Sequence, residues 1–245
     1  MPKALNEEQI LGYKKNGFVS PVPIFNAVEV AACRADVEKT ESTMGEFFRG
    51  IGQTKFYLRF PWAYKMATHP KLLDAVEDLI GPDIMIYHNT AWIKEPSDDA
   101  YVSWHQDNTY FGHNPCNVLT AWIALSPATE RSGCMQFLPG SHKQGKIEHI
   151  HGTEAVPSSP HLPTDEYKLE DSVPVPAKRG DVVVFSYYTI HGSYINQTKR
   201  SRRMVRIGYR HPHNKQISQD QMGYEPGIMV SGYRDRRSGE NLLIP

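Results

Sequence analysis

The chain has 245 residues, of which 40% are hydrophobic, and its 27 basic and 27 acidic residues give a formal net charge of zero. A balanced charge gives no electrostatic reason to expect nucleic-acid binding, and no apolar run reaches the roughly 18 to 20 residues that a membrane helix needs. We therefore expect a single domain over residues 1–245 that acts on a small molecule, without a nucleic-acid or membrane partner.

The cysteines and the first residues bear on the cellular compartment. The sequence contains Cys33, Cys116 and Cys134, and their odd number and spacing fit neither a disulfide framework nor a zinc knuckle. Residues 1–8 lack the apolar core of a signal peptide. We therefore expect a cytoplasmic protein, and the sequence favours no particular oligomeric state.

The N-terminal part, residues 1–82, has the pattern of helices. A capping box predicts a helix that begins at Asn6, and a second helix is predicted to begin at Asn26 and to end before Gly45. A third is predicted over residues 69–81, with proline near its start and glycine just past its end.

From residue 83 the pattern changes to short runs rich in β-branched and aromatic residues, which are typical of strands. Such runs occupy residues 83–94, 117–125, 134–138, 181–188 and 203–210. Strands after a helical opening favour a mainly β fold with flanking helices, in which an antiparallel double sheet forms a jelly roll.

Residues 148–177 differ from both parts. They are rich in proline, serine, histidine and acidic residues, and they exceed the usual length of a loop between strands. We expect a lid-like loop over an active site, although partial disorder is the other interpretation.

His105, Asp107 and His191 are the residues that say most about chemistry. Residues two apart on a strand share a face, so His105 and Asp107 can bind one ion, and the apolar run 181–186 would bring His191 to the same place. Two imidazoles and one carboxylate form the facial triad that binds non-haem Fe(II) and leaves positions open. A structural zinc site would require a fourth ligand, commonly cysteine, and none is adjacent. His88 lies on a strand that could face the same cavity.

A basic residue downstream would complete this chemistry. Fe(II) needs a co-substrate that supplies electrons, and a 2-oxoacid does so if a cation holds its far carboxylate, for which arginine is best suited. Arg202 follows His191 by eleven residues, about the distance for the next strand to return. Alternation along the strand puts Arg206 and Arg210 on the same face as Arg202, where they could bind an anionic substrate. The alternative is a solvated strand edge, which would also be rich in arginine.

Four sequence blocks carry a resemblance to a known family. They are residues 104–110, which include the His-x-Asp pair, 120–125, 133–142 and 180–193. In order and spacing they resemble the phytanoyl-CoA dioxygenase family of Fe(II)- and 2-oxoglutarate-dependent oxygenases, over roughly residues 83–210.

The resemblance implies a double-stranded β-helix, the cupin-like form of the jelly roll, with the triad as iron ligands and O2 as the oxidant. It also implies a set of residues around 2-oxoglutarate: Arg202, Ser193, Trp122 and Thr120. Trp122 could equally be ordinary core. Because Asp107 is present where related halogenases have a small residue, hydroxylation, or another oxidation such as desaturation or ring closure, is favoured over halogenation.

The expected substrate is a small polar metabolite, either anionic or neutral. Its contacts are expected from residues around the mouth of the site: Tyr57, Arg59, Asn89, Asn108, Tyr110 and Arg206. Two alternatives remain open at this point. One is desaturation or cyclisation of a natural product by the same cofactors. The other is a cupin-like metal-binding protein without redox function, which would not need Arg202.

Overall fold

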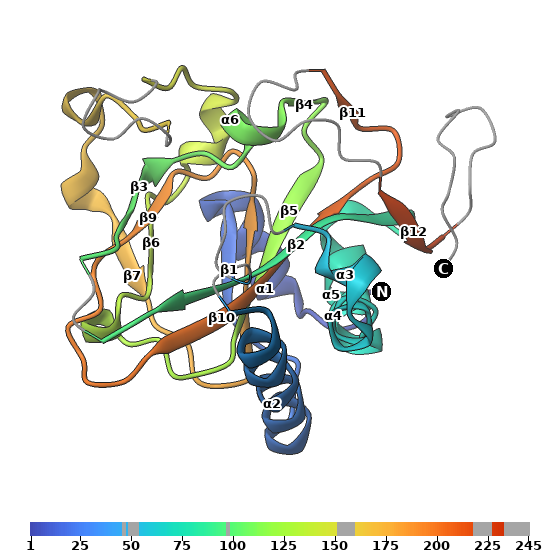
Figure 1. Ribbon diagram of the computed structural model, residues 1–245. Coiled ribbons are helices and arrows are strands. Elements are labelled where there is room, and N and C mark those ends of the chain that lie inside the picture. The colour runs from blue at the N-terminus through green and yellow to red at the C-terminus, as the bar shows by residue number, and fades with distance from the viewer. Residues whose placement is uncertain (46–47, 49–53, 97–98, 151–159, 218–226, 233–245) are drawn as a thin grey trace.

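The computed structural model describes residues 1–45, 48, 54–96, 99–150, 160–217 and 227–232. Two antiparallel sheets face each other, and helices from the N-terminal part cover the outer face of the larger sheet (Figure 1). The mainly β fold with flanking helices is therefore confirmed, and its two facing sheets form a double-stranded β-helix.

The three predicted helices are confirmed, each close to its predicted ends. They are α1 (Glu7–Asn16), α2 (Ala27–Met44) and α5 (Pro70–Ile80). Asn6 and Asn26 each make a capping box, which satisfies the first free backbone N–H groups of α1 and α2. Further short helices were not predicted: α3 (Phe56–Arg59), α4 (Pro61–Ala67) and α6 (Asn108–Phe111).

The larger sheet has the strand order β1-β8-β5-β10-β2-β12. Its strands are β1 (Phe18–Pro23), β8 (Asp181–Ser186), β5 (Val118–Ala124), β10 (Arg202–Arg210), β2 (Ile84–Lys94) and β12 (Ile228–Ser231). Strand β10 lies between β5 and β2, so its backbone is bonded on both sides.

The smaller sheet has the strand order β3-β9-β6-β7. Its strands are β3 (Val102–His105), β9 (His191–Ser193), β6 (Met135–Phe137) and β7 (Val173–Val175). A separate two-stranded ribbon joins β4 (His113–Asn114) and β11 (Lys215–Gln216).

Alternation along β5 and β10 divides the core into two layers. Ala121 and Ile207 are buried against the helices, whereas Trp122 and Met204 point between the two sheets, where they join a second apolar cluster. A third cluster, mainly aromatic, joins Tyr87, Phe111, Val118 and Tyr187. Polar residues of β10 with the same parity as Met204 must therefore lie inside the fold.

The predicted lid-like loop is described over residues 148–150 and 160–177. It contains two 3-10 helices, Thr164–Glu166 and Leu169–Asp171, followed by β7. The Leu162 N–H donates to the Trp104 carbonyl at 2.9 Å, which attaches the loop to β3. Residues 151–159 lie outside the described residues, and a lid function stays a prediction.

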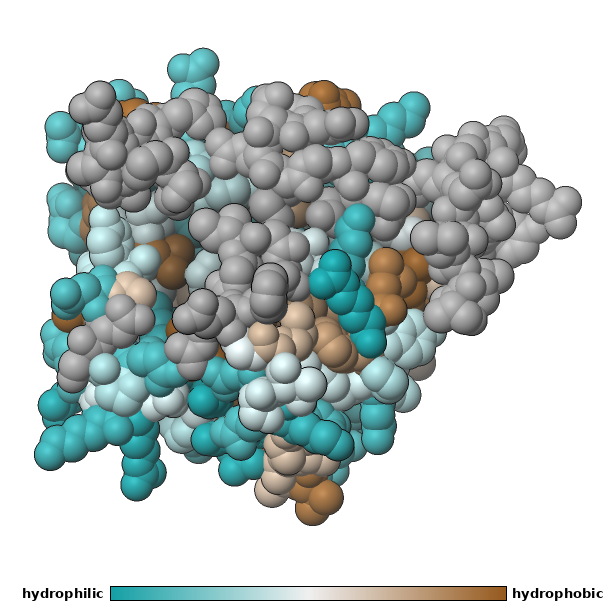
Figure 2. Space-filling model, viewed as in Figure 1, coloured by the Kyte–Doolittle hydropathy of each residue, from teal (hydrophilic) through white to brown (hydrophobic). Residues whose placement is uncertain are grey.

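On the face shown in Figure 2, the coloured part of the surface is largely hydrophilic to intermediate, with hydrophobic residues in separate small groups. Among the described helices, none combines the length and the apolar character needed to span a bilayer.

Candidate active site

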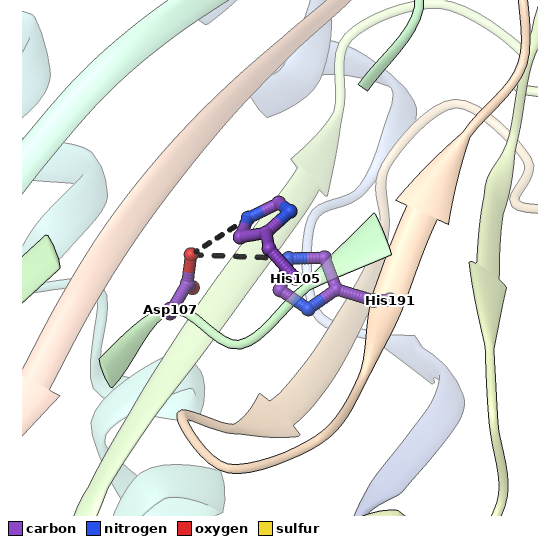
Figure 3. A group of neighbouring side chains, drawn as sticks. All are labelled: His105, Asp107 and His191. Carbon is purple, nitrogen blue, oxygen red and sulfur yellow. Dashed lines mark ion pairs between the residues drawn. The ribbon is translucent and has the colours of Figure 1, made fainter. Parts of the chain in front are cut away.

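His105, Asp107 and His191 converge inside the fold. His105 ends β3, His191 begins β9, and the two are register partners in the smaller sheet, with ring centroids 4.3 Å apart. Asp107 Oδ1 lies 3.6 Å from His105 Nε2 and 3.8 Å from His191 Nε2 (Figure 3). All three are buried, and their ligand atoms lie within 4.8 Å of one another. In the described part of the chain the group has three members, so an ion bound there would keep open positions.

Backbone carbonyls orient both imidazoles. His105 Nδ1 lies 2.7 Å from the Ser103 carbonyl oxygen, and His191 Nδ1 lies 2.9 Å from that of Thr189. A carbonyl can only accept, so each Nδ1 donates a hydrogen bond to it and each Nε2 is the ring nitrogen that faces the shared space. The histidines are thus held in the tautomer that binds a metal.

Charges around the triad favour the metal-binding protonation states. Burial alone would raise the pKa of Asp107, but Arg206 and the two histidines hold that pKa well below its usual range, so the carboxylate is ionised. Burial and the nearby His105 lower the pKa of His191 to about 3, so its ring is neutral near pH 7. These are the forms that divalent iron requires.

Arg206 and Thr120 bind the two oxygens of Asp107 separately. Arg206 Nη1 donates to Oδ1 at 3.0 Å, and the Thr120 hydroxyl donates to Oδ2 at 2.8 Å. Arg206 Nη2 also lies 3.1 Å from His88 Nε2, which must accept this hydrogen bond. His88 therefore lies on the face that carries the triad, which the sequence analysis had given as one option for its strand.

Gln106 points away from the triad and joins the loops that carry it. Its side-chain amide donates to the carbonyls of Gly145 and Tyr188 at 2.8 and 2.7 Å, and its amide oxygen accepts from the Ile147 N–H at 3.0 Å. Its backbone N–H donates to His149 Nε2. Gln106, which lies between His105 and Asp107, is therefore a buried residue that connects three segments of the chain.

Arg202 is a buried cation with unused donors. Its Nε and Nη1 atoms have no hydrogen-bond partner among the described residues, and its guanidinium lies 5.5 Å from the centre of the Trp122 ring, whose Nε1 is also unpartnered there. Burial lowers the Arg202 pKa to about 10, so the group remains charged near neutral pH. An unpaired buried guanidinium is unfavourable in free energy, and an anion would relieve this cost.

Ser193 has a partner that the sequence analysis missed. The ammonium group of Lys94 donates to the Ser193 hydroxyl at 2.8 Å, to the Ser193 carbonyl at 3.0 Å and to the Tyr194 carbonyl. The Ser193 hydroxyl in turn donates to the Gly133 carbonyl at 2.9 Å, so its single proton is already used. Lys94 is the register partner of Arg202, and its inward parity was the signal that could have identified it.

The residues predicted to contact substrate lie in different places. Tyr110 and Arg206 lie at the triad, with the Tyr110 ring 5.4 Å from that of His105. Asn108 instead begins α6 and exchanges hydrogen bonds with the backbone of His113, the first residue of β4.

The other three predicted contacts are not on the face of the triad. Asn89 pairs with Ile207, whose side chain faces the helices, so Asn89 points away from the triad. Tyr57 packs in the helix-side core, and Arg59 is exposed on α3. The segment that contains Tyr57 and Arg59, which was expected at the mouth of the site, forms helix α3.

Comparison with known proteins gives a family match. The model of the phytanoyl-CoA dioxygenase (PhyH) family matches residues 13–204, a range that contains the triad and Arg202. Phytanoyl-CoA dioxygenase 1 of Oryza sativa subsp. japonica is 35% identical over 114 residues, which are 46% of this chain and 40% of that protein. The matched part is therefore less than half of the rice protein. The resemblance seen in the sequence is confirmed.

Two further proteins match most of the chain. A probable alpha-ketoglutarate-dependent hypophosphite dioxygenase of Stutzerimonas stutzeri is 29% identical over 229 residues, covering 82% of this chain and 77% of that protein. The solved structure of the non-heme monooxygenase ThoJ, in its apo form, superposes with a TM-score of 0.80 at 25% identity, covering 96% of this chain and 86% of ThoJ.

Proposed function

Because this chain belongs to the phytanoyl-CoA dioxygenase family of Fe(II)- and 2-oxoglutarate-dependent oxygenases, we propose that it hydroxylates a small, polar, anionic metabolite. The observation that carries the proposal is the buried triad, whose imidazole tautomers are already set, in a fold that also buries an arginine without an anion.

The residues fit both cofactors. His105, Asp107 and His191 would hold Fe(II), since neutral imidazole and carboxylate suit this ion. Arg202 would hold the far carboxylate of 2-oxoglutarate through its unpartnered N–H groups, with the Trp122 ring packed beside it. When bound, iron would allow O2 to act as the oxidant: 2-oxoglutarate would give up two electrons and become succinate and CO2, and a substrate C–H bond would become C–OH.

The protein's own part is to position the reactants and to exclude water. The rings of Phe185 and Phe137 lie 4.7 and 5.9 Å from that of His191, which keeps one side of the ligands apolar. A dry site protects the reaction from side oxidation.

Charge balance supports an anionic substrate. Fe(II) and the 2-oxoglutarate dianion would cancel, and Asp107 and Arg206 cancel each other, so these four groups together with the buried Arg202 would carry one positive charge. His88 accepts from Arg206 through Nε2, so its Nδ1 carries a proton. This Nδ1 and Arg206 Nε have no partner within the described parts of the chain and could donate to an oxyanion. The hypophosphite dioxygenase named above, by its name, acts on a small anion.

The test is succinate release from 2-oxoglutarate by the anaerobically reconstituted protein after O2 is added. Small phosphonates, other small oxyanions and uncharged amides of similar size form the panel. We expect the anions to stimulate release and the amides not to. Stimulation by the uncharged compounds alone would refute the anionic substrate. No succinate with any compound would favour a metal-binding protein without redox function.

A variant of Asp107 tests the cofactor site directly. Anaerobic addition of Fe(II) and 2-oxoglutarate to the wild type should give a weak visible absorption band, and Asp107→Asn should weaken or abolish it, because a neutral amide is a poor ligand and leaves Arg206 without a counter-charge. His191→Gln is the second variant, with circular dichroism as the control for folding. An unchanged band in both folded variants would contradict the metal assignment.

A further inference from the structure

The two oxygens of Asp107 have different surroundings. Oδ1 faces the Nε2 atoms of both histidines and accepts from Arg206, whereas Oδ2 accepts from the Thr120 hydroxyl at 2.8 Å. A metal bound by the two imidazoles would therefore meet Oδ1, while Oδ2 is occupied by a hydroxyl donor.

Thr120 is held rigidly in this position. It is fully buried in β5, between register partners Gly208 on β10 and Phe185 on β8. A Cβ atom at Gly208 would lie 2.8 Å from the Tyr187 hydroxyl and 3.0 Å from Cε1 of Tyr87, so these rings occupy the space above the glycine. Packing of this kind leaves the threonine side chain little freedom to move.

Arg206 opposes rotation of the same carboxylate. Its Nη1 binds Oδ1 and its Nη2 binds His88, so the guanidinium is fixed at two points. To present both oxygens to a metal, the Asp107 carboxylate would have to turn away from Arg206 and from Thr120 together. Both hydrogen bonds are to an ionised group and are therefore among the stronger ones.

We propose that Thr120 keeps Asp107 a one-oxygen ligand, so that one coordination position stays free after 2-oxoglutarate has bound. The proposal rests on the metal site of the proposed function. An octahedral ion with two imidazoles and one carboxylate oxygen has about three positions left, and 2-oxoglutarate fills two of them. If Asp107 bound through both oxygens, 2-oxoglutarate would fill the remaining positions and none would be left for O2. Thr120 is thus a positioning residue, and its hydroxyl acts on the ligand rather than on the co-substrate that the sequence analysis suggested.

The experiment counts water molecules on bound Mn(II), an ion of similar ligand preference, by water-proton relaxation with and without 2-oxoglutarate. The variant is Thr120→Val, which has nearly the same shape without the hydroxyl, and the matched control is Thr120→Ser, which keeps it. In the valine variant Oδ2 is buried without a donor, so it turns to the cation. Thr120→Ala replaces the valine variant if that protein does not fold.

In the wild type and in Thr120→Ser we expect about three exchanging waters on Mn(II) alone and about one with 2-oxoglutarate. In Thr120→Val the inner-sphere relaxation should fall by about a third without 2-oxoglutarate and disappear with it. Wild-type water numbers in the valine or alanine variant would overturn the proposal, as would a wild-type complex with 2-oxoglutarate that retains no water. If the wild type does not bind Mn(II) or Fe(II) at all, the proposed function itself has failed, which is a different result.

Discussion

Replacement of Arg202 by methionine separates the function of this residue from its effect on stability. The guanidinium is buried and its Nε and Nη1 atoms have no partner in the described structure. Methionine has a similar length and can fill the space beside Trp122 without a charge. Arg203→Met is the matched control, because Arg203 is the next residue of β10 and pairs on the opposite face with Glu41.

The magnitude follows from the lost contacts. Two hydrogen bonds between a guanidinium and a carboxylate contribute about 1.5–3 kcal/mol each, so Arg202→Met should weaken 2-oxoglutarate binding by about 10²- to 10⁴-fold. The folded state lowers the Arg202 pKa to about 10, which corresponds to a cost of roughly 3 kcal/mol for keeping the side chain charged. The methionine variant avoids this cost, but it also loses the contact between the guanidinium and Trp122, which reduces the gain in stability by about 1–2 kcal/mol.

The sign of the stability effect depends on pH. Because the fold lowers the pKa of a base, the cost is fully present below pH 10 and disappears as the pH rises above that value. Near pH 7 the cofactor-free Arg202→Met protein should therefore unfold at a temperature higher than the wild type by roughly 2–8 °C.

Calorimetric titration of 2-oxoglutarate into the anaerobic Mn(II) protein measures the first effect, and thermal unfolding measures the second. We expect Arg203→Met to leave 2-oxoglutarate affinity unchanged. Wild-type affinity for 2-oxoglutarate in Arg202→Met would refute the reasoning and place the carboxylate elsewhere. A large fall in the unfolding temperature together with lost affinity would mean that Arg202 has a structural partner.

Two further substitutions test the framework of the site by thermal unfolding. Gln106→Ala leaves three partly buried backbone groups without their side-chain partner, at about 1 kcal/mol each, and should lower the unfolding temperature by roughly 6–12 °C. A fall of less than about 2 °C would show that the loops are held in another way. Gly208→Ala puts a Cβ 2.8 Å from the Tyr187 hydroxyl and should destabilise the fold by about 1–3 kcal/mol. The control is Gly12→Ala in α1, where nothing lies within 4 Å of the added Cβ, and it should not destabilise the fold. Equal effects of the two substitutions would contradict the packing argument.

Local signals were sufficient for the regular elements of the fold. The capping residues Asn6 and Asn26 predicted two helices because a cap involves residues only three positions apart. Alternation on β10 predicted that Arg202 and Arg206 lie inside, since parity depends on the strand alone. Family resemblance supplied the order of the site blocks, and the triad could be identified from two of them.

Contacts between strands could not be predicted in the same way. The pairing of Lys94 with Ser193, and of Thr120 with Asp107, depends on which strands are neighbours and in which register. Asn89 was expected at the site, but it is the register partner of Ile207, and both side chains therefore face the helices. Tyr57 lies in a sequence rich in aromatic residues that would suit a strand, and tertiary packing of α3 against β2 overrides that preference.

In the proposed complex, the central position of β10 would set the length of the acid that the site holds. Arg202 and Arg206 are four residues apart on one strand, so their Cα atoms are separated by about 13 Å. In the proposed complex Arg202 would hold the distant end of the acid, whereas Arg206 binds the carboxylate of Asp107. Because β10 is hydrogen-bonded to a strand along each edge, it cannot stretch or shorten, and the distance between Arg202 and Arg206 stays constant. A dicarboxylate one methylene longer or shorter than the one that fits would miss one of its two attachment points.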